Sequence, residues 1–218
     1  MLNNLNIGSG VGFTSDLTIG GGVPIWLNPK DLQRVTGGFN ITNVPAARCL
    51  IPGGTPITYD EATRLANICF RFELYADAAH DDTVYQIVKD NTKYGTLAKV
   101  GMNIMAMPAT LATDGAAYAI TEIDTSNADY DTITLGTTIG VGYSAGDVLA
   151  EADSAHASTA VLLYTAKALT GRDLLVEDDN LTYSATGVYF GAIYNRRIRK
   201  IAAIERAALP QIKFSESK

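Results

Sequence analysis

The chain has 218 residues, 47% of them hydrophobic, which is enough apolar material for one large packed domain or two small ones. Its formal charge of −6 argues against a protein that wraps nucleic acid, because phosphate binding needs an excess of Lys and Arg. Only 18% of the residues are charged, while glycine (20) and tyrosine (11) are plentiful. This balance favours a mainly β fold with small α content over long solvated helices.

Targeting signals are missing from the sequence as it begins. The first residues carry neither the basic region nor the apolar run of a signal peptide, and no apolar stretch reaches the roughly 18 residues of a membrane span. We therefore expect a protein made in a cytoplasm, with neither nucleic acid nor a membrane as its partner. In such a compartment Cys49 and Cys69 are expected to be buried, reduced thiols, although a disulfide between them is conceivable.

Residues 1–40 are predicted to form an extended N-terminal arm. The segment is rich in Gly, Asn and Thr, and its start shows no sustained helical or strand period. Because such a segment buries little by itself, we expect it to lie along another chain through its apolar residues. These candidate contact residues are Ile19, Val23, Ile25, Trp26 and Leu27. Trp26 and its neighbours have the alternative of joining the core of their own chain.

Residues 41–94 and 154–195 are predicted to form one β domain. The stretch 49–68, "CLIPGGTPITYDEATRLANI", is typical of a β-hairpin with a turn near Asp60. After it, from 67 to 74, apolar and polar residues alternate. That period of two predicts a strand with one face in the core and one face in water.

Residues 95–153 are predicted to be a small β unit inserted into that domain. Short strand-like runs alternate there with polar turns, such as the loop 124–131, "DTSNADYD", whose side chains favour turns. We expect this unit to be separable, because insertions of this kind enter at surface loops.

The last segment, 196–218, is predicted to be a helix followed by a final strand. Apolar residues recur at helical spacing from Ile198, and Pro210 ends the run. Four cations stand at the start of this helix: Arg196, Arg197, Arg199 and Lys200. A helix N-terminus is a poor place for positive charge, so either carboxylates of the fold or an acidic partner surface must offset it. The four cations are therefore candidate contact residues.

The sequence offers little support for catalysis. The glycine-rich stretch 140–146, "GVGYSAG", lacks the spacing and the strand-to-helix context of a dinucleotide loop. His80 and His156 show no metal-ligand spacing, and the acidic pairs at 81–82 and 177–179 match no calcium loop. We therefore expect a protein that is not an enzyme, with no catalytic residues, no cofactor and no metal site.

Four short stretches resemble a known family. "LIPGGTPITYDEATRLANI", "TAKALTGRDLLVEDDN", "GVYFGAIYNRRI" and "AALPQIKF" are similar to parts of the head decoration and head fibre proteins of tailed bacteriophages, including crAss-like phages. The resemblance covers 44–68 and 159–214. The inserted unit, 95–153, departs from the smaller members of that family.

The resemblance implies a structural, auxiliary capsid protein on the outer surface of the virion, assembled in the host cytoplasm. It implies a decoration-type β domain, a homotrimer, and an N-terminal arm that engages the major capsid protein, with other head or fibre proteins as further partners. Its role would be to stabilise the shell or to project a domain from it.

A different class of function remains open at this point. A virion-associated, carbohydrate-binding module for host adhesion would use aromatic rings of the inserted unit as its contact surface. The candidate glycan contacts are Tyr118, Tyr130 and Tyr143. Binding to capsids stripped of accessory proteins distinguishes the first function, and saturable binding to host polysaccharide distinguishes the second.

Overall fold

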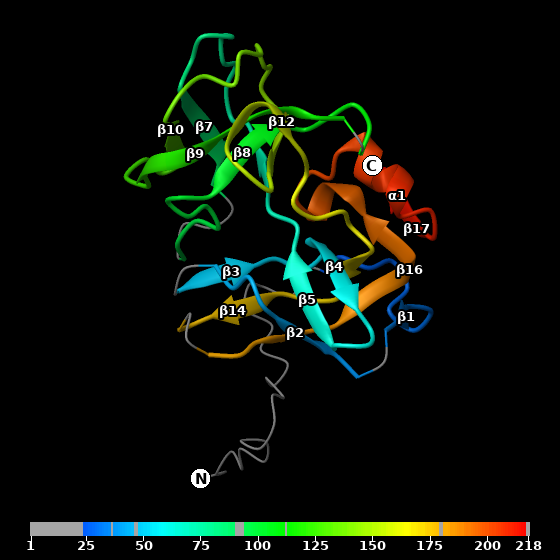
Figure 1. The fold of residues 1–218 in the computed structure, drawn as a ribbon. Helices are drawn as coiled ribbons and strands as arrows, with labels where there is room; N and C mark the ends of the chain where they lie inside the picture. Colours follow the sequence, from blue (N-terminus) through cyan, green and yellow to red (C-terminus); the bar gives the residue numbers. More distant parts are fainter. Residues whose placement is uncertain are drawn as a thin grey trace.

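The computed structural model is mainly β, as the composition predicts, with one sheet below and a second above it in the view of Figure 1. The structure describes residues 24–35, 37–45, 48–89, 94–111, 113–178 and 181–216. The candidate arm contacts Ile19 and Val23 lie outside these ranges, so their role stays a prediction.

The first sheet contains eight strands. They are β1 (Gln33–Arg34), β2 (Phe39–Ile41), β4 (Pro56–Asp60), β5 (Leu65–Ile68), β13 (Ala168–Thr170), β15 (Ser184–Ala185), β16 (Gly187–Tyr194) and β17 (Ile212–Ser215). Their order is β1-β16-β13-β4-β5-β2-β15. The eighth strand, β17, lies off this path and pairs in parallel with the end of β16, from Gly191 to Tyr194. The predicted hairpin is present as β4 and β5, whereas the strand before it, β3 (Cys49–Ile51), pairs with β14 (Leu174–Val176) in a separate ribbon.

The second sheet closes into a barrel. Its strands are β6 (Arg71–Glu73), β7 (Val84–Val88), β8 (Asn103–Ala106), β9 (Gly115–Asp124), β10 (Tyr130–Leu135), β11 (Val148–Glu151) and β12 (His156–Ala160). The order is β6-β11-β8-β9-β10-β7, and β12 pairs with β9. Closure comes from an antiparallel bridge between Leu74 and Ile87 and from the Tyr75 N–H, which donates to the Gln86 carbonyl at 2.9 Å.

The barrel extends beyond the inserted unit expected from the sequence. Residues 95–153 contain β8 to β11, while β6, β7 and β12 come from outside that range. A single hydrophobic cluster fills the barrel and continues into the first sheet. Its members include Ile51, Ile68, Phe70, Phe72, Leu74, Tyr85, Ile87, Ile104, Ile120, Ile133, Leu135 and Leu149. The two sheets therefore share one core rather than holding separate ones.

A second cluster packs under the C-terminal segment. It contains Trp26, Cys69, Leu169, Val188, Ile193, Ile201, Leu209 and Ile212. This cluster explains why one prediction for residues 67–74 is wrong. The polar face of that stretch was expected to be exposed to solvent. Cys69 and Arg71 on that face are 1% and 5% exposed, because this cluster and the C-terminal segment cover them. Both cysteines are buried and free, as predicted.

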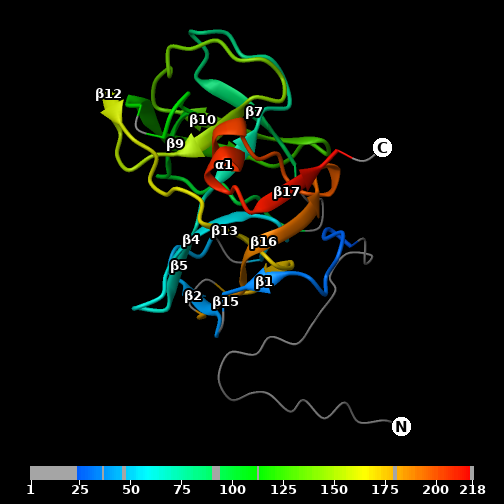
Figure 2. The same ribbon diagram turned by 90° about the vertical axis from the view of Figure 1, so that its right-hand side faces the viewer.

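The C-terminal helix is shorter than predicted. Helix α1 spans only Ala203–Ala208, and a single 3₁₀ turn, η1, spans Asn195–Arg197. Between them the backbone is extended, with φ −124° and ψ 165° at Ile198. The prediction failed at the cations, since a helix starting there would place four of them at its positive end, whereas α1 has Glu205 in its first turn. The final strand is confirmed as β17, which runs beside β16 in Figure 2.

Part of the expected arm belongs to the first sheet. Trp26 forms an antiparallel bridge with Ile193, and its ring N–H donates to the Gly171 carbonyl at 2.9 Å. Farther along, β1 pairs with β16. The boundary predicted at residue 40 is therefore wrong for residues 24–35, which pack on their own chain.

Candidate functional site

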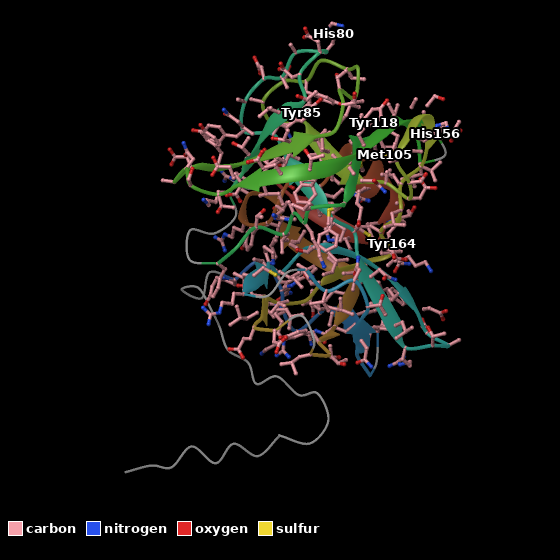
Figure 3. All side chains as sticks on the ribbon, turned by 60° about the vertical axis from the view of Figure 1, so that its left-hand side comes forward. His80, Tyr85, Met105, Tyr118, His156 and Tyr164 are labelled. Atoms are coloured by element: carbon pink, nitrogen blue, oxygen red, sulfur yellow. The ribbon has the colours of Figure 1, made fainter. Side chains whose placement is uncertain are left out.

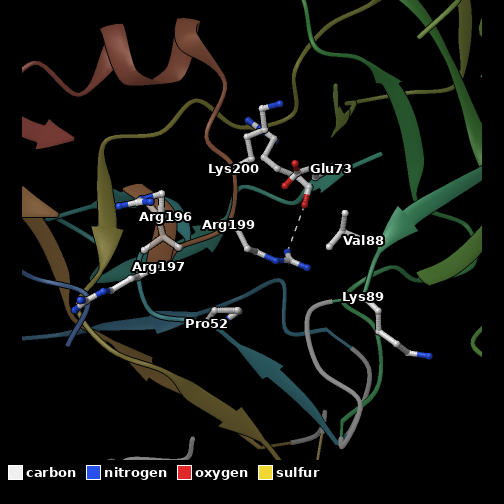
Figure 4. A pocket seen from close by; sticks show the side chains of 10 residues that line it. Pro52, Glu73, Val88, Lys89, Arg196, Arg197, Arg199 and Lys200 are labelled. Atoms are coloured by element: carbon white, nitrogen blue, oxygen red, sulfur yellow. Dashed lines mark hydrogen bonds between the residues drawn. The ribbon is translucent and has the colours of Figure 1, made fainter. Parts of the chain in front are cut away.

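The main candidate site is a basic cleft where the barrel meets the first sheet (Figure 4). Its volume is about 360 Å³, a size within the range of ligand sites. Its walls come from β6, from the end of β7 and the residue after it, from the loop after β3, from η1 and from the segment between η1 and α1. The lining residues are Pro52, Arg71, Glu73, Val88, Lys89, Arg196, Arg197, Ile198, Arg199 and Lys200.

The glycines of the "PGGT" stretch, Gly53 and Gly54, allow close packing against them. Residues 196–200, which we call the basic segment, approach Gly54 through Ile198. Gly54 has φ +82°, a conformation that glycine adopts without strain. A Cβ at Gly54 would lie 2.5 Å from Ile198 Cγ2, and one at Gly53 would lie 2.7 Å from Ile25 Cδ1. A larger residue at Gly54 would therefore have to displace the Ile198 side chain. The close approach of Ile198 thus sets where the neighbouring cations lie.

Arg199 reaches the interior of the cleft. Its Nη1 donates to the Arg71 carbonyl at 3.3 Å, and Figure 4 shows the Glu73 carboxylate turned toward its guanidinium. Burial lowers the pKa of Arg199 to about 10, while the charges of Cys49 and Glu73 act in the opposite direction. Arg199 therefore stays protonated at neutral pH and holds a positive charge inside the cleft.

Arg71 forms the back wall and is held by a buried ion pair with α1. Its Nε donates to Glu205 Oε1 at 2.9 Å, and the two side chains are 4% and 0% exposed. The other nitrogens donate to the Phe70 carbonyl at 2.7 Å and the Tyr164 carbonyl at 2.9 Å. With these contacts in place, Arg71 shapes the wall and fixes α1 against the barrel.

Three further cations of the cleft are Lys89 after β7, Arg197 in η1 and Lys200 before α1. Lys89 forms an ion pair with Asp131 at 3.0 Å. Arg197 Nη1 donates to the Pro24 carbonyl at 2.7 Å, with the guanidinium 4.1 Å from the centre of the Tyr194 ring. Lys200 Nζ donates to the Gly146 carbonyl. These carbonyl contacts orient the two side chains without neutralising them.

The cleft has a clear excess of positive charge. Six of its lining residues are cations and one, Glu73, is an acid. Adding Glu205 and Asp131, which pair with Arg71 and Lys89, brings the acids to three, still half the number of cations. Positive charge concentrated in a cleft attracts anions more strongly than the same charge on an open surface. The cleft is therefore suited to an acidic ligand or partner.

Sequence reasoning identified part of this cleft. Arg196, Arg197, Arg199 and Lys200 were predicted as contact residues, and the structure brings all four to its walls. Arg71 and Lys89 were missed. Local pattern shows Arg71 only as a cation on the polar face of its strand, because its position beside residues 196–200 depends on long-range packing.

The three candidate arm contacts that the structure describes, Ile25, Trp26 and Leu27, differ in their burial. Trp26 is 5% exposed and belongs to the second cluster, so it is removed from the candidate surface contacts. Ile25 packs against the same cluster. Leu27 is 39% exposed and is the member of this group that remains at the surface.

The three candidate glycan tyrosines do not gather into one surface. Tyr143 packs against the barrel core, with its ring centroid 6.0 Å from that of Tyr85, and burial raises its pKa. Tyr118 also packs against this core, and Figure 3 places it on the barrel. Tyr130 lies on the outside, with its ring centroid 5.1 Å from that of Tyr75, which is 45% exposed. The three rings have different neighbours, and their role as glycan contacts stays a prediction.

The described ranges contain neither a metal-ligand cluster nor a membrane-spanning helix. No group of three or more His, Cys, Asp or Glu residues is placed there to hold a metal ion. His80 and His156 lie apart on the outside of the barrel in Figure 3. No helix in the described part is long and apolar enough to cross a bilayer.

Comparison with known proteins gives no family for this chain. No protein-family model matches it, no curated protein is significantly similar, and no solved structure matches its fold. The geometry of the cleft and the sequence resemblance are thus the grounds for a functional proposal.

Proposed function

We propose that this chain is a structural virion protein that binds the outer surface of a tailed-phage head, as an accessory to the major capsid protein. The observation that carries the proposal is the basic cleft. A chain of net charge −6 places six cations around one hollow. Complementary charge of this kind steers a protein to an acidic partner and fixes its orientation there.

The sequence resemblance supports the same proposal. The stretches that resemble head decoration proteins are distant in the chain but contribute adjacent parts of the cleft. "LIPGGT" supplies Pro52, and "YNRRI" supplies Arg196, Arg197 and Ile198, whose side chain packs on Gly54. The resembling stretches thus supply four of the ten lining residues of the cleft.

The mechanism of attachment follows from the charges. Arg199 and Arg71 provide fixed, partly or fully buried charge, while Arg197 and Lys200 stand at the rim. Rim cations chiefly speed encounter and make binding salt-dependent, whereas buried cations chiefly slow dissociation. The occupant we propose is an acidic surface segment of the capsid protein, with the barrel projecting away from the shell.

A homotrimer is part of the proposal, because the sequence resemblance implies one. Light scattering at micromolar concentration measures this directly. A trimer supports the proposal, and a monomer alone at that concentration would contradict this part of it.

The experiment that tests the proposal is binding to phage heads stripped of accessory proteins, measured by co-sedimentation. The double variant Arg197→Glu and Lys200→Glu reverses two rim charges that have no carboxylate contact in the described ranges. We expect its affinity for heads to fall at least about tenfold, as reversed charges oppose an acidic surface.

The matched control reverses two exposed lysines away from the cleft, Lys99→Glu and Lys213→Glu. It changes the net charge by the same amount and should bind heads with nearly the affinity of the original chain. Equal binding by the cleft variant and the original chain would refute the proposal. A portal or major capsid gene beside the gene for this chain would support it independently.

A further inference from the structure

A second hollow, of about 390 Å³, lies on the first sheet and shares no residue with the basic cleft. Strands β1, β4 and β16 and the turn after β4 supply its walls. Its lining residues are Arg34, Val35, Tyr59, Glu61, Arg64 and Tyr189. We refer to these six residues as the tyrosine–arginine pocket.

The tyrosines of this pocket are held in place from below. The Tyr59 ring packs on the ring of Phe39, which is 1% exposed, with centroids 4.8 Å apart. The Tyr189 hydroxyl donates to Gln33 Oε1 at 3.1 Å. Burial is the largest cause of a raised pKa at Tyr59, so its phenol is neutral at physiological pH. Two oriented phenol rings therefore line one hollow.

Arg64 has an unusual backbone conformation. It lies in the turn between β4 and β5 with φ +59°, a left-handed conformation that glycine or asparagine usually occupies. Its guanidinium lies 4.7 Å from the centre of the Phe39 ring and packs on Gly37, where a Cβ would come within 2.1 Å of Nη2. An arginine that is strained in its backbone yet tightly seated in its side chain is an outlier that suggests a role for the side chain.

We propose that the tyrosine–arginine pocket binds a sugar ring that carries a carboxylate, such as a uronic acid unit of a polysaccharide. Guanidinium groups match a carboxylate with paired hydrogen bonds, and Arg34 and Arg64 supply two of them. The tyrosine rings offer apolar faces to the ring of the sugar and hydroxyls to its edge. This site is independent of attachment to the shell.

Glu61 at the pocket wall determines which anionic ligand the pocket prefers. A carboxylate at the wall of the pocket accepts hydrogen bonds from sugar hydroxyls, which a phosphate ion at neutral pH does not offer in the same number. The same charge repels a doubly charged phosphate more than a singly charged carboxylate. The pocket chemistry thus favours a hydroxylated carboxylic acid over a bare phosphate.

The test is binding of an oligogalacturonate to the full chain, followed by NMR and calorimetry, with a neutral galactose oligosaccharide and inorganic phosphate as comparison ligands. We expect saturable binding of the oligogalacturonate alone. Arg64→Gly should weaken it at least about tenfold, because a charge-assisted pair is lost. The thermal midpoint should change little, because glycine relieves the backbone at φ +59° while the contact of the guanidinium with Phe39 is lost.

Arg48 offers a matched control. It also has φ +59°, is exposed and lies outside the pocket, so Arg48→Gly relieves the same backbone conformation without removing a pocket cation. Its affinity for oligogalacturonate should equal that of the original chain. The proposal is overturned if the chain fails to bind oligogalacturonate, if the neutral sugar or phosphate binds as tightly, or if the two glycine variants lose affinity equally.

Discussion

The buried ion pair between Arg71 and Glu205 should be a main attachment of the C-terminal segment to the barrel. Glu205→Gln keeps the shape of the side chain but leaves the Arg71 charge, 5% exposed, without its counter-charge. Breaking a buried pair costs about 3 to 5 kcal/mol. The Gln carbonyl still accepts a hydrogen bond, and two backbone carbonyls still contact Arg71, so we expect the lower figure, about 3 kcal/mol.

Thermal unfolding followed by circular dichroism measures this loss. For a chain of this size about 3 kcal/mol lowers the midpoint by roughly 6 to 12 °C. The control is Glu216→Gln, which breaks the pair with Arg206 at 3.2 Å, where the side chains are 30% and 64% exposed. An exposed pair contributes at most about 1 kcal/mol, so its loss should lower the midpoint by no more than a few degrees. Equal shifts for the two variants would refute the reasoning.

Three further predictions follow from the same structure. Burial raises the pKa of Glu151 from 4.5 to about 7, so its folded form holds the proton more tightly and the stability it contributes falls as pH rises through that window. If Glu151 were fully shielded from water, ionising it would lower the free energy of unfolding by about 3 kcal/mol, and its partial exposure reduces this loss to about 1 to 2 kcal/mol. Glu151→Gln should therefore raise the free energy of unfolding at pH 8 by about 1 to 2 kcal/mol and leave it little changed at pH 4, as measured by urea titration. A loss of stability at pH 8 would contradict this. Burial raises the pKa of Cys49 to about 11 and of Cys69 to about 12, so iodoacetamide at pH 8 should label neither until the chain unfolds, and rapid labelling of the native protein would argue against the packing. Replacing 95–153 with a Gly/Ser linker should abolish cooperative unfolding, because it removes four of the barrel strands and exposes the shared core, whereas a sharp transition in calorimetry would show a separable unit.

Much of the β architecture is predictable from local pattern. The alternation of residues 67–74 correctly identified Ile68, Phe70, Phe72 and Leu74 as core residues, because strand geometry places every second side chain on one face. The burial of the opposite face was not predictable in this way. It depends on Glu205, which is 134 residues away from its partner Arg71.

Barrel closure escaped prediction for a similar reason. The bridge between Leu74 and Ile87 joins two strands that local pattern shows only as separate strands. A short stretch of sequence does not show that β6 and β7 are the two ends of one sheet and that they meet to close it. The expected boundary at residue 95 marked a change of composition, whereas the barrel begins with β6.

The four cations of the basic segment could be predicted from the sequence, but the cleft that they line could not. Four cations at the start of a helical pattern indicated a conflict with the helix dipole, and the chain resolves it by delaying the helix to Ala203. The conflict therefore predicted a functional or structural use of the charges. The cleft itself also depends on Pro52 and Lys89, which follow β3 and β7 and are brought to it by tertiary packing.

The most direct test of the central proposal is a cryo-electron-microscopy reconstruction of stripped heads incubated with this protein. The basic cleft should face the shell, with Arg197 and Lys200 in contact with acidic residues of the major capsid protein, and the barrel should project outward. Bound protein whose cleft faces solvent, or heads that remain bare at saturating protein, would contradict the account.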